Sequence, residues 1–184
     1  MSKFIIVFIV LFLQACGSKS TSLPEQLPDD TKAKGNNSSQ LEQAMVVLDR
    51  RSGQCGKCPV YTISIYDTGK VIYEGKENVK TKGLVESKID RSELEQLIQL
   101  FENSQFFKLN NKYDRGENCS DPVLSDSPYA FISFSDGKTV KSVRHYLGCV
   151  ETTNLREDVS KDLNTLFKLE ESVDKSVNSK QWIK

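Results

Sequence analysis

The chain has 184 residues, which is enough for one domain with additional segments. Its 25 lysine and arginine residues balance 25 aspartate and glutamate residues, so no net field attracts it to nucleic acid or to an anionic surface. The basic residues are also scattered along the sequence. We therefore expect no nucleic-acid partner.

A short positive start, Met1–Lys3, precedes an unbroken apolar run of ten residues, Phe4–Leu13. This run is too short for a transmembrane helix, which needs about 20 residues, but it suits the apolar region of a secretory signal. It ends in Leu13–Gly17 (Leu-Gln-Ala-Cys-Gly), which resembles the bacterial lipobox, whose cysteine receives a diacylglycerol. We predict that residues 1–15 are a lipoprotein signal peptide and that Cys16 is lipidated. The alternative is an ordinary signal peptide with a chance cysteine.

Residues 16–40 are rich in Ser, Pro, Asn, Asp and Lys and contain only two leucines. Such a segment cannot bury enough apolar surface to order itself, so we expect a lipidated flexible tether. Acyl chains on Cys16 would anchor it in a lipid bilayer, since about 0.8 kcal/mol accrues per buried methylene. Gly17–Ser18 lacks the aspartate that marks inner-membrane retention in Gram-negative lipoproteins. By analogy, we expect the periplasmic face of the outer membrane.

The predicted domain spans residues 41–184 and begins with a short apolar strand, Ala44–Asp49. The next strand, Val60–Tyr66, is rich in β-branched and aromatic residues. After the turn Asp67–Lys70, the segment Val71–Gly75 returns antiparallel to it. We therefore predict a β-hairpin here.

Two apolar stripes at helical spacing predict two helices. The first follows the possible N-caps Asp90 and Ser92, and the second follows Thr152–Asn154. The stripes consist of Leu94, Leu97, Ile98 and Phe101, and of Leu155, Val159, Leu163, Leu166, Leu169 and Val173. We also expect the single tryptophan, Trp182, to pack back on the domain.

Between these helices the sequence predicts a loop, Asn110–Pro128, and a second hairpin made of Tyr129–Phe134 and Thr139–Leu147. The order of elements is strand, hairpin, helix, hairpin, helix. We therefore predict an α+β fold, a single domain with an antiparallel sheet of about five strands and two helices packed on one face.

Four cysteines besides Cys16 are available for disulfides, namely Cys55, Cys58, Cys119 and Cys149. An even count in an oxidising compartment favours disulfide bonds. We favour Cys119–Cys149, which closes a long loop and could contribute ~3 kcal/mol, together with Cys55–Cys58 as a tight local pair. The rival is a crossed arrangement in which Cys55 or Cys58 reaches the loop.

The motif Cys55-Gly56-Lys57-Cys58 also has the spacing of a thiol–disulfide redox site. In thioredoxin-like proteins the first cysteine lies at a helix N-terminus, whose dipole lowers its pKa. Here the motif precedes a predicted strand, so this dipole is missing, although Lys57 could help. We therefore favour a structural disulfide over a redox catalyst.

A zinc site made from these cysteines, with or without His145, is a further hypothesis, but the spacing is weak and the compartment argues against it. We interpret His145, the only histidine, as a hydrogen-bonded strand residue. The acidic loop around Asp121 could attract calcium, but it has no EF-hand spacing. We expect no metal and no other cofactor.

The pattern Cys-Gly-x-Cys-Pro-x-Tyr at Cys55–Tyr61 is followed by Gly69, Val71, Tyr73 and Gly75, and later by Phe106-Phe107, Tyr113, Asp121 and His145-Tyr146. This combination resembles a bacterial family catalogued as domain of unknown function 6438, over about residues 43–174. The family looks like a secreted or lipid-anchored one and has no assigned activity. The resemblance therefore implies only the extent of the fold and the compartment.

These features predict a membrane-anchored bacterial envelope lipoprotein with a disulfide-stabilised domain. We expect the domain to be a non-enzymatic binding or structural module whose partner is another envelope protein or a cell-wall component. The candidate contact residues are Lys57, Tyr61, Asp121 and His145. The alternative is a periplasmic thiol–disulfide redox protein that uses Cys55 and Cys58.

Overall fold

The computed structural model describes residues 43–119, 124–149 and 156–184. Its strands are β1 (Val46–Arg51), β2 (Val60–Ile65), β3 (Lys70–Glu77), β4 (Gly83–Lys88), β5 (Lys112–Tyr113), β6 (Tyr129–Ser135) and β7 (Val140–Tyr146). Its helices are α1 (Arg91–Asn103), the 3₁₀ helix η1 (Phe106–Lys108), α2 (Glu157–Ser176) and α3 (Lys180–Ile183). The predicted signal peptide and tether, with Cys16, and the candidate contact residue Asp121 lie outside the described residues.

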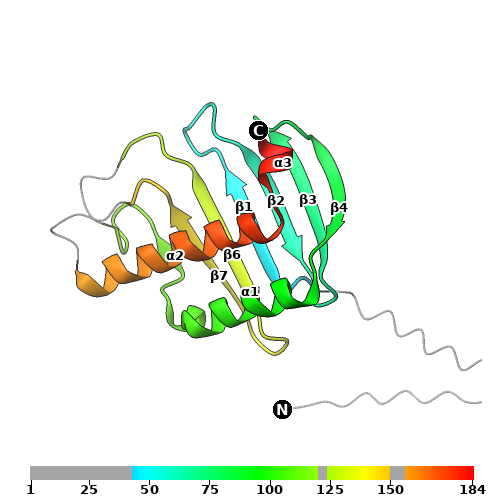
Figure 1. The fold of residues 1–184 in the computed structure, drawn as a ribbon. Helices are drawn as coiled ribbons and strands as arrows, with labels where there is room; N and C mark the ends of the chain where they lie inside the picture. Colours follow the sequence, from blue (N-terminus) through cyan, green and yellow to red (C-terminus); the bar gives the residue numbers. More distant parts are fainter. Residues whose placement is uncertain (1–42, 120–123, 150–155) are drawn as a thin grey trace, which may run out of the picture. The chain divides into compact units, whose positions relative to one another are not determined.

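The strands form a sheet in the order β4-β3-β2-β1-β6-β7-β5, so β1 lies in the middle (Figure 1). β1 pairs antiparallel with β2 on one side and with β6 on the other. β3 and β4 extend the sheet from β2, and β7 extends it from β6, all antiparallel. The predicted α+β class is confirmed. The expected number of five strands is wrong, because the sheet has seven.

The two strands that the sequence did not predict lie at the two edges of the sheet. The side chains of β4 are largely exposed, and Leu84 has 75% of its surface accessible. β5 has two residues, lies inside the predicted loop and runs parallel to β7, so the sheet is mixed rather than antiparallel. An edge strand with exposed polar side chains lacks the apolar alternation from which strands are predicted.

The hairpin of β2 and β3 forms as predicted, with Ile65 opposite Val71 at its closed end. Gly69 in its turn has a φ of 80°, a conformation that L side chains rarely adopt. A Cβ atom at this position would lie 2.7 Å from the carbonyl oxygen of Ile89. The turn therefore requires glycine both for its backbone angle and for its close approach to the next segment.

Both predicted helices form and cover the same face of the sheet (Figure 1). The carboxylate of Asp90 accepts a hydrogen bond from the backbone N–H of Glu93 at 2.7 Å, which caps α1. The residues that the helices bury are Leu94, Leu97 and Phe101 in α1, and Val159, Leu163, Leu166, Leu169, Glu170 and Val173 in α2. Leu155 and Thr152–Asn154 lie outside the described residues. In the described part of the chain, no helix has the length and apolar content needed to cross a membrane.

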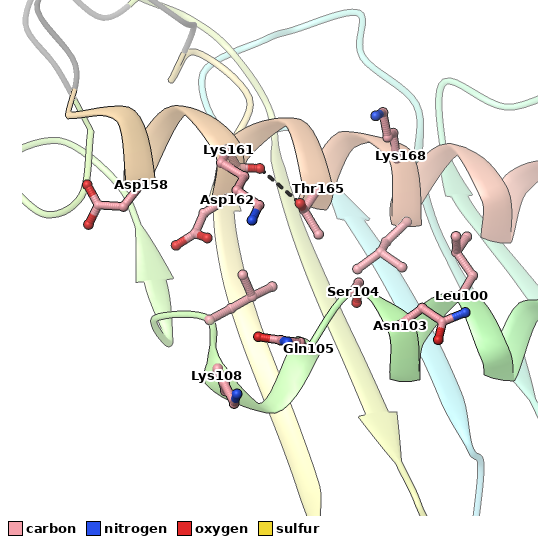
Figure 2. Close-up of a pocket in the computed structure, with 12 residues that line it drawn as sticks. Leu100, Asn103, Ser104, Gln105, Lys108, Asp158, Lys161, Asp162, Thr165 and Lys168 are labelled. Carbon is pink, nitrogen blue, oxygen red and sulfur yellow. Dashed lines mark hydrogen bonds between the residues drawn. The ribbon is translucent and has the colours of Figure 1, made fainter.

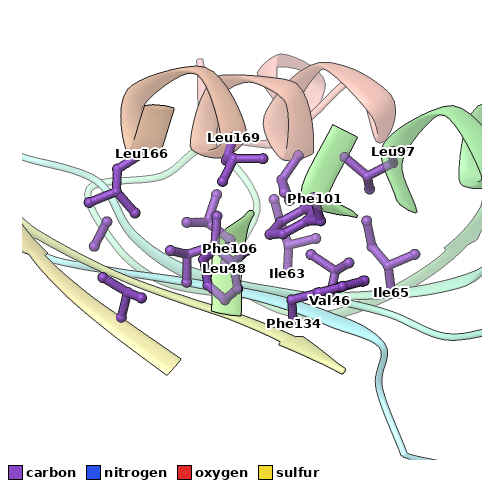
Figure 3. Packing of buried hydrophobic residues seen from close by; sticks show 14 of the residues in the cluster. Val46, Leu48, Ile63, Ile65, Leu97, Phe101, Phe106, Phe134, Leu166 and Leu169 are labelled. Carbon is purple, nitrogen blue, oxygen red and sulfur yellow. The ribbon is translucent and has the colours of Figure 1, made fainter. Parts of the chain in front are cut away.

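The core lies between these helices and the sheet (Figure 3). Val46 and Leu48 from the central strand are fully buried in it. The ring of Phe101 stacks on that of Phe134 with 4.8 Å between their centroids, which joins α1 to β6. Burial of these apolar side chains is the main force that holds the helix layer on the sheet.

Trp182 in α3 packs back on the domain as predicted. Its side chain is buried, and its ring centroid lies 4.7 Å from that of Tyr73 on β3. The backbone N–H of Thr81 also donates to the carbonyl of Trp182 at 2.9 Å. The C-terminal segment is therefore attached to the β3–β4 turn by both packing and hydrogen bonding.

Candidate functional site

Tyr61 and His145, two of the candidate contact residues, belong to one buried polar network between the sheet and α2. Glu170 of α2 is 1% exposed, and its two carboxylate oxygens lie 2.7 Å from His145 Nδ1 and 2.7 Å from Arg50 Nη1. Asp174, one helical turn later, accepts from Arg50 Nη2 at 3.0 Å and from the Tyr61 hydroxyl at 2.8 Å. The network therefore links three strands, β1, β2 and β7, to one helix.

The charges in this network compensate one another. Burial lowers the pKa of Arg50, but the carboxylates of Glu170 and Asp174 outweigh this effect and hold the pKa above its ordinary value. Burial raises the pKa of Tyr61, and the carboxylate of Asp174 raises it further. Arg50 thus stays charged and Tyr61 stays a neutral hydrogen-bond donor. A buried carboxylate is tolerated only when it is paired in this way.

The environment of His145 favours a structural role. The side chain is fully buried, and its ring lies against the edge of Phe167 with 4.7 Å between the centroids. Its Nε2 atom has no hydrogen-bond partner within the described part of the chain. The prediction of a hydrogen-bonded strand histidine is confirmed through Glu170. We interpret the network as an ionic connection that positions α2 on the sheet.

The Cys55–Cys58 motif forms a disulfide in the loop between β1 and β2. The side-chain amide of Asn78 donates to the carbonyls of Gly56 and Cys58, at 3.3 and 3.0 Å. The loop leads into a strand, so the first cysteine has no helix N-terminus beside it. Lys57 is exposed in this loop and does not belong to the network of Tyr61 and His145.

The second disulfide joins Cys119 to Cys149, with 5.4 Å between their Cα atoms and a sequence separation of 30. Cys149 is fully buried and Cys119 packs against the core. The observed pairing is the one favoured from the sequence, not the crossed arrangement. Within the described residues, no three His, Cys, Asp or Glu side chains are grouped so that they could hold a metal ion, so the zinc hypothesis has no site there.

A pocket of about 520 Å³ lies between α1 and α2, beside η1 (Figure 2). Its lining combines leucines, side-chain amides and lysines, chiefly Leu100, Leu109, Leu169, Asn103, Gln105, Lys108, Lys161 and Lys168. Gln105 has a φ of 56° and is therefore held in the left-handed region that favours glycine. The pocket offers hydrogen-bond donors and positive charge above an apolar floor.

Two acidic residues, Asp158 and Asp162, also line this pocket. Asp158 is exposed and lies 3.7 Å from Arg156 Nε, and the charge of Asp162 is engaged by Tyr113. The hydroxyl of Tyr113, which is fully buried on β5, donates to Asp162 Oδ2 at 2.5 Å. Burial raises the pKa of Tyr113 and this hydrogen bond raises it further. By contrast, no carboxylate of the described residues forms an ion pair with Lys108, Lys161 or Lys168. The pocket therefore offers side-chain amides and ammonium groups together with the exposed carboxylate of Asp158.

Sequence reasoning missed this pocket and three of the five network residues, Arg50, Glu170 and Asp174. The pocket residues belong to no motif, and the left-handed Gln105 is not a glycine that would have marked a turn. Arg50 is 120 residues from Glu170 in sequence. One feature of the sequence could have indicated the network: Glu170 occupies a position on the apolar stripe of α2, between Leu169 and Val173.

The fold and the site define a class of protein: an α+β domain in which one layer of helices covers a seven-stranded mixed sheet. One disulfide lies within the β1–β2 loop and the other joins Cys119 to Cys149. The sequence profile of the family described as domain of unknown function (DUF6438) matches residues 46–169, from the first residue of β1 into α2. The chain belongs to this family. No curated protein matches the chain.

Proposed function

We propose that this chain is a lipid-anchored protein of the bacterial envelope whose disulfide-linked domain binds another envelope protein or a cell-wall component. The observation that carries the proposal is the combination of a lipobox-like segment, Leu13–Gly17, with a domain whose four cysteines form two disulfides. Structural disulfides persist in oxidising compartments outside the cytoplasm. The periplasmic face of the outer membrane is the location we propose.

The pocket between α1 and α2 supports a binding role. The side-chain amides of Asn103 and Gln105 and the ammonium groups of the three lining lysines make no hydrogen bonds to other described residues. A leucine floor with a few polar groups around it is the usual composition of a ligand site. The pocket would suit a polar or anionic segment of an envelope component better than a purely apolar ligand.

Cell fractionation of the wild type and of a Cys16→Ser variant tests the location. The wild type should sediment with the outer membrane, and the variant should leave the membrane fraction, because it lacks the thiol that carries the lipid. The control is a Cys55→Ser variant, which loses a thiol of the domain but keeps Cys16. It should fractionate like the wild type. Wild-type protein in the cytosolic fraction would overturn the proposal.

A thiol–disulfide redox role is the second candidate. It is favoured by the partly exposed sulfurs of Cys55 and Cys58 and by Lys57 beside them. In that reaction the two reduced thiols would pass two electrons to a substrate disulfide and close the Cys55–Cys58 bond. Reduction of a test disulfide by the reduced domain, with loss of this activity in Cys55→Ser, would support the redox role over binding.

A further inference from the structure

Folding gathers lysines that are scattered in the sequence at one end of the domain. Three segments there, residues 52–60, 78–85 and 175–184, contain six lysines and no aspartate or glutamate. They are the β1–β2 loop, the β3–β4 turn with the start of β4, and the C-terminal segment with α3. In a chain with no net charge, such a region is a local excess of positive charge. We call it the lysine end.

The three segments are held together by hydrogen bonds. The side chain of Asn78 donates to the carbonyls of Gly56 and Cys58 in the β1–β2 loop. On its other side, the β3–β4 turn donates from the backbone N–H of Thr81 to the carbonyl of Trp182 at 2.9 Å. The lysines of these segments therefore share one surface, and Figure 1 shows the β3–β4 turn and α3 together at the same end of the sheet.

Five of the six lysines are exposed and form no ion pair with the described residues: Lys57, Lys80, Lys82, Lys180 and Lys184. The sixth, Lys175, pairs with Glu171 at 2.9 Å. Most carboxylates that border the segments are engaged as well, since Asp174 accepts from Arg50, Tyr61 and Ser179. Glu77 and Glu86 are the exceptions. The lysine end thus carries ammonium groups in excess of free carboxylates.

A pocket of about 340 Å³ opens within this surface. Its lining is mixed in charge, since it contains Lys175, Lys180 and Lys184 together with Glu171 and Asp174, and also Tyr61, Asn178, Ser179 and Ile183. Glu171 pairs with Lys175 and Asp174 pairs with Arg50, so Lys180 and Lys184 are the lysines of this pocket that form no ion pair with the described residues. Outside the pocket the other lysines are spread along the β1–β2 loop and the β3–β4 turn, so the surface as a whole fits an extended partner rather than one small molecule.

The lysine end lies at the opposite end of the sheet from the point where the described chain enters. The backbone of Met45 pairs with Ile65 and Ser135, beside the turns of the two hairpins. β1 then runs the length of the sheet to reach the β1–β2 loop (Figure 1). A partner can therefore bind the lysine end without contacting the residues at which the described chain enters the sheet.

From these observations we infer that the lysine end binds the carboxylate-bearing peptide stems of the cell wall. This inference rests on the proposed function, because it requires the domain to lie in the envelope. The three segments contain no arginine, and lysine acts as a compact point charge without the planar fork with which arginine binds carboxylate or phosphate in two places at once. Single carboxylates repeated along a polymer match such point charges, and the contact should weaken as salt rises.

Co-sedimentation of the purified full chain, in detergent, with purified peptidoglycan sacculi tests this inference. The wild type should sediment at low salt and be released at high salt. The double variant Lys80→Gln/Lys184→Gln should bind about fivefold more weakly, as expected for two exposed ion pairs. The matched control Lys88→Gln/Lys138→Gln makes the same charge change at exposed lysines elsewhere and should bind like the wild type. Equal thermal unfolding midpoints would show that both variants are folded.

Three results would overturn the inference: no sedimentation of the wild type, an equal loss in the control, or binding that disappears when the sacculi are first treated with protease. The last result would assign the surface to a wall-bound protein. These results are independent of the fractionation experiment. If the protein is found in the membrane fraction but does not bind sacculi, only the inference about the lysine end is refuted. If the protein is found in the cytosol, the proposed function is refuted.

Discussion

Glu170 shows how a single acidic residue can be essential to an apolar helix face. It lies on the buried stripe of α2, where a leucine would be the ordinary choice, and it contacts both Arg50 and His145. Breaking such a buried pair leaves an uncompensated charge, which costs about 3–5 kcal/mol. The network therefore also specifies which face of α2 meets the sheet, because any other rotation would leave Arg50 without Glu170.

Tyr61 should make the stability of the domain depend on pH. Its pKa is raised by burial and by Asp174, so in the folded state it ionises at higher pH than in the unfolded chain, where the pKa is about 10. The stability that it contributes is therefore fully present below about pH 10 and is lost as the pH rises above that value, by up to about 1.4 kcal/mol per pH unit.

We expect Tyr61→Phe to be less stable than the wild type at pH 8, by about 1.5–3 kcal/mol, because it loses a hydrogen bond to a carboxylate. Between pH 10 and 11.5 its free energy of unfolding should fall less steeply than that of the wild type. Urea denaturation across this range measures both quantities. Parallel curves for the two proteins would show that the Tyr61 hydroxyl is not held neutral by its surroundings.

The sequence singled out Tyr61 and His145 as separate residues, but it could not show that they share partners. Each lies on a strand, and the acids that join them come from a helix more than 20 residues later than His145. Lys57, grouped with them from the sequence, lies instead in the exposed disulfide loop. Local patterns identify polar residues on buried strands, whereas their partners are decided by tertiary packing.

At the scale of elements, the sequence predicted those strands and helices that bury one apolar face in the core. The β2–β3 hairpin and the stripes of both long helices have apolar residues at the spacing of their secondary structure, and these elements form where predicted. The edge strands β4 and β5 lack this apolar spacing, since β4 exposes Leu84 and β5 has only two residues. Their place in the sheet depends on backbone pairing with β3 and β7, which leaves little trace in the sequence.

The two disulfides close chain loops of very different length, so they should contribute differently to stability. Cys119 and Cys149 are separated by 30 residues and Cys55 and Cys58 by three. The loss of unfolded-state entropy grows with loop length. Replacing Cys119 and Cys149 by alanine should therefore lower the free energy of unfolding by about 3–4 kcal/mol, and replacing Cys55 and Cys58 by about 2 kcal/mol.

Urea denaturation of the two double variants at neutral pH measures this difference. Wild-type protein treated with a reductant serves as a control, and it should be no more stable than the less stable double variant. If the Cys55/Cys58 variant were the less stable of the two, the short loop would contribute native contacts that chain entropy does not describe.

At the scale of the whole molecule, the fold of a chain with no net charge gathers lysines into one region. Segments far apart in sequence, at residues 52–60, 78–85 and 175–184, place their lysines together. The balanced charge and the scattered basic residues led us to expect no nucleic-acid partner, and the balance describes only the total charge of the chain. Where each lysine lies depends on strand order, which the sequence did not reveal.

The central claim is that Cys16 is acylated and that the domain therefore lies outside the cytoplasm, where its disulfides form. The mass of the N-terminal peptide of the protein purified from membranes tests this claim most directly. We predict a peptide that begins at Cys16, lacks residues 1–15 and carries the added mass of a diacylglycerol and fatty acid. A peptide that still begins at Met1, with an unmodified thiol at Cys16, would contradict the account.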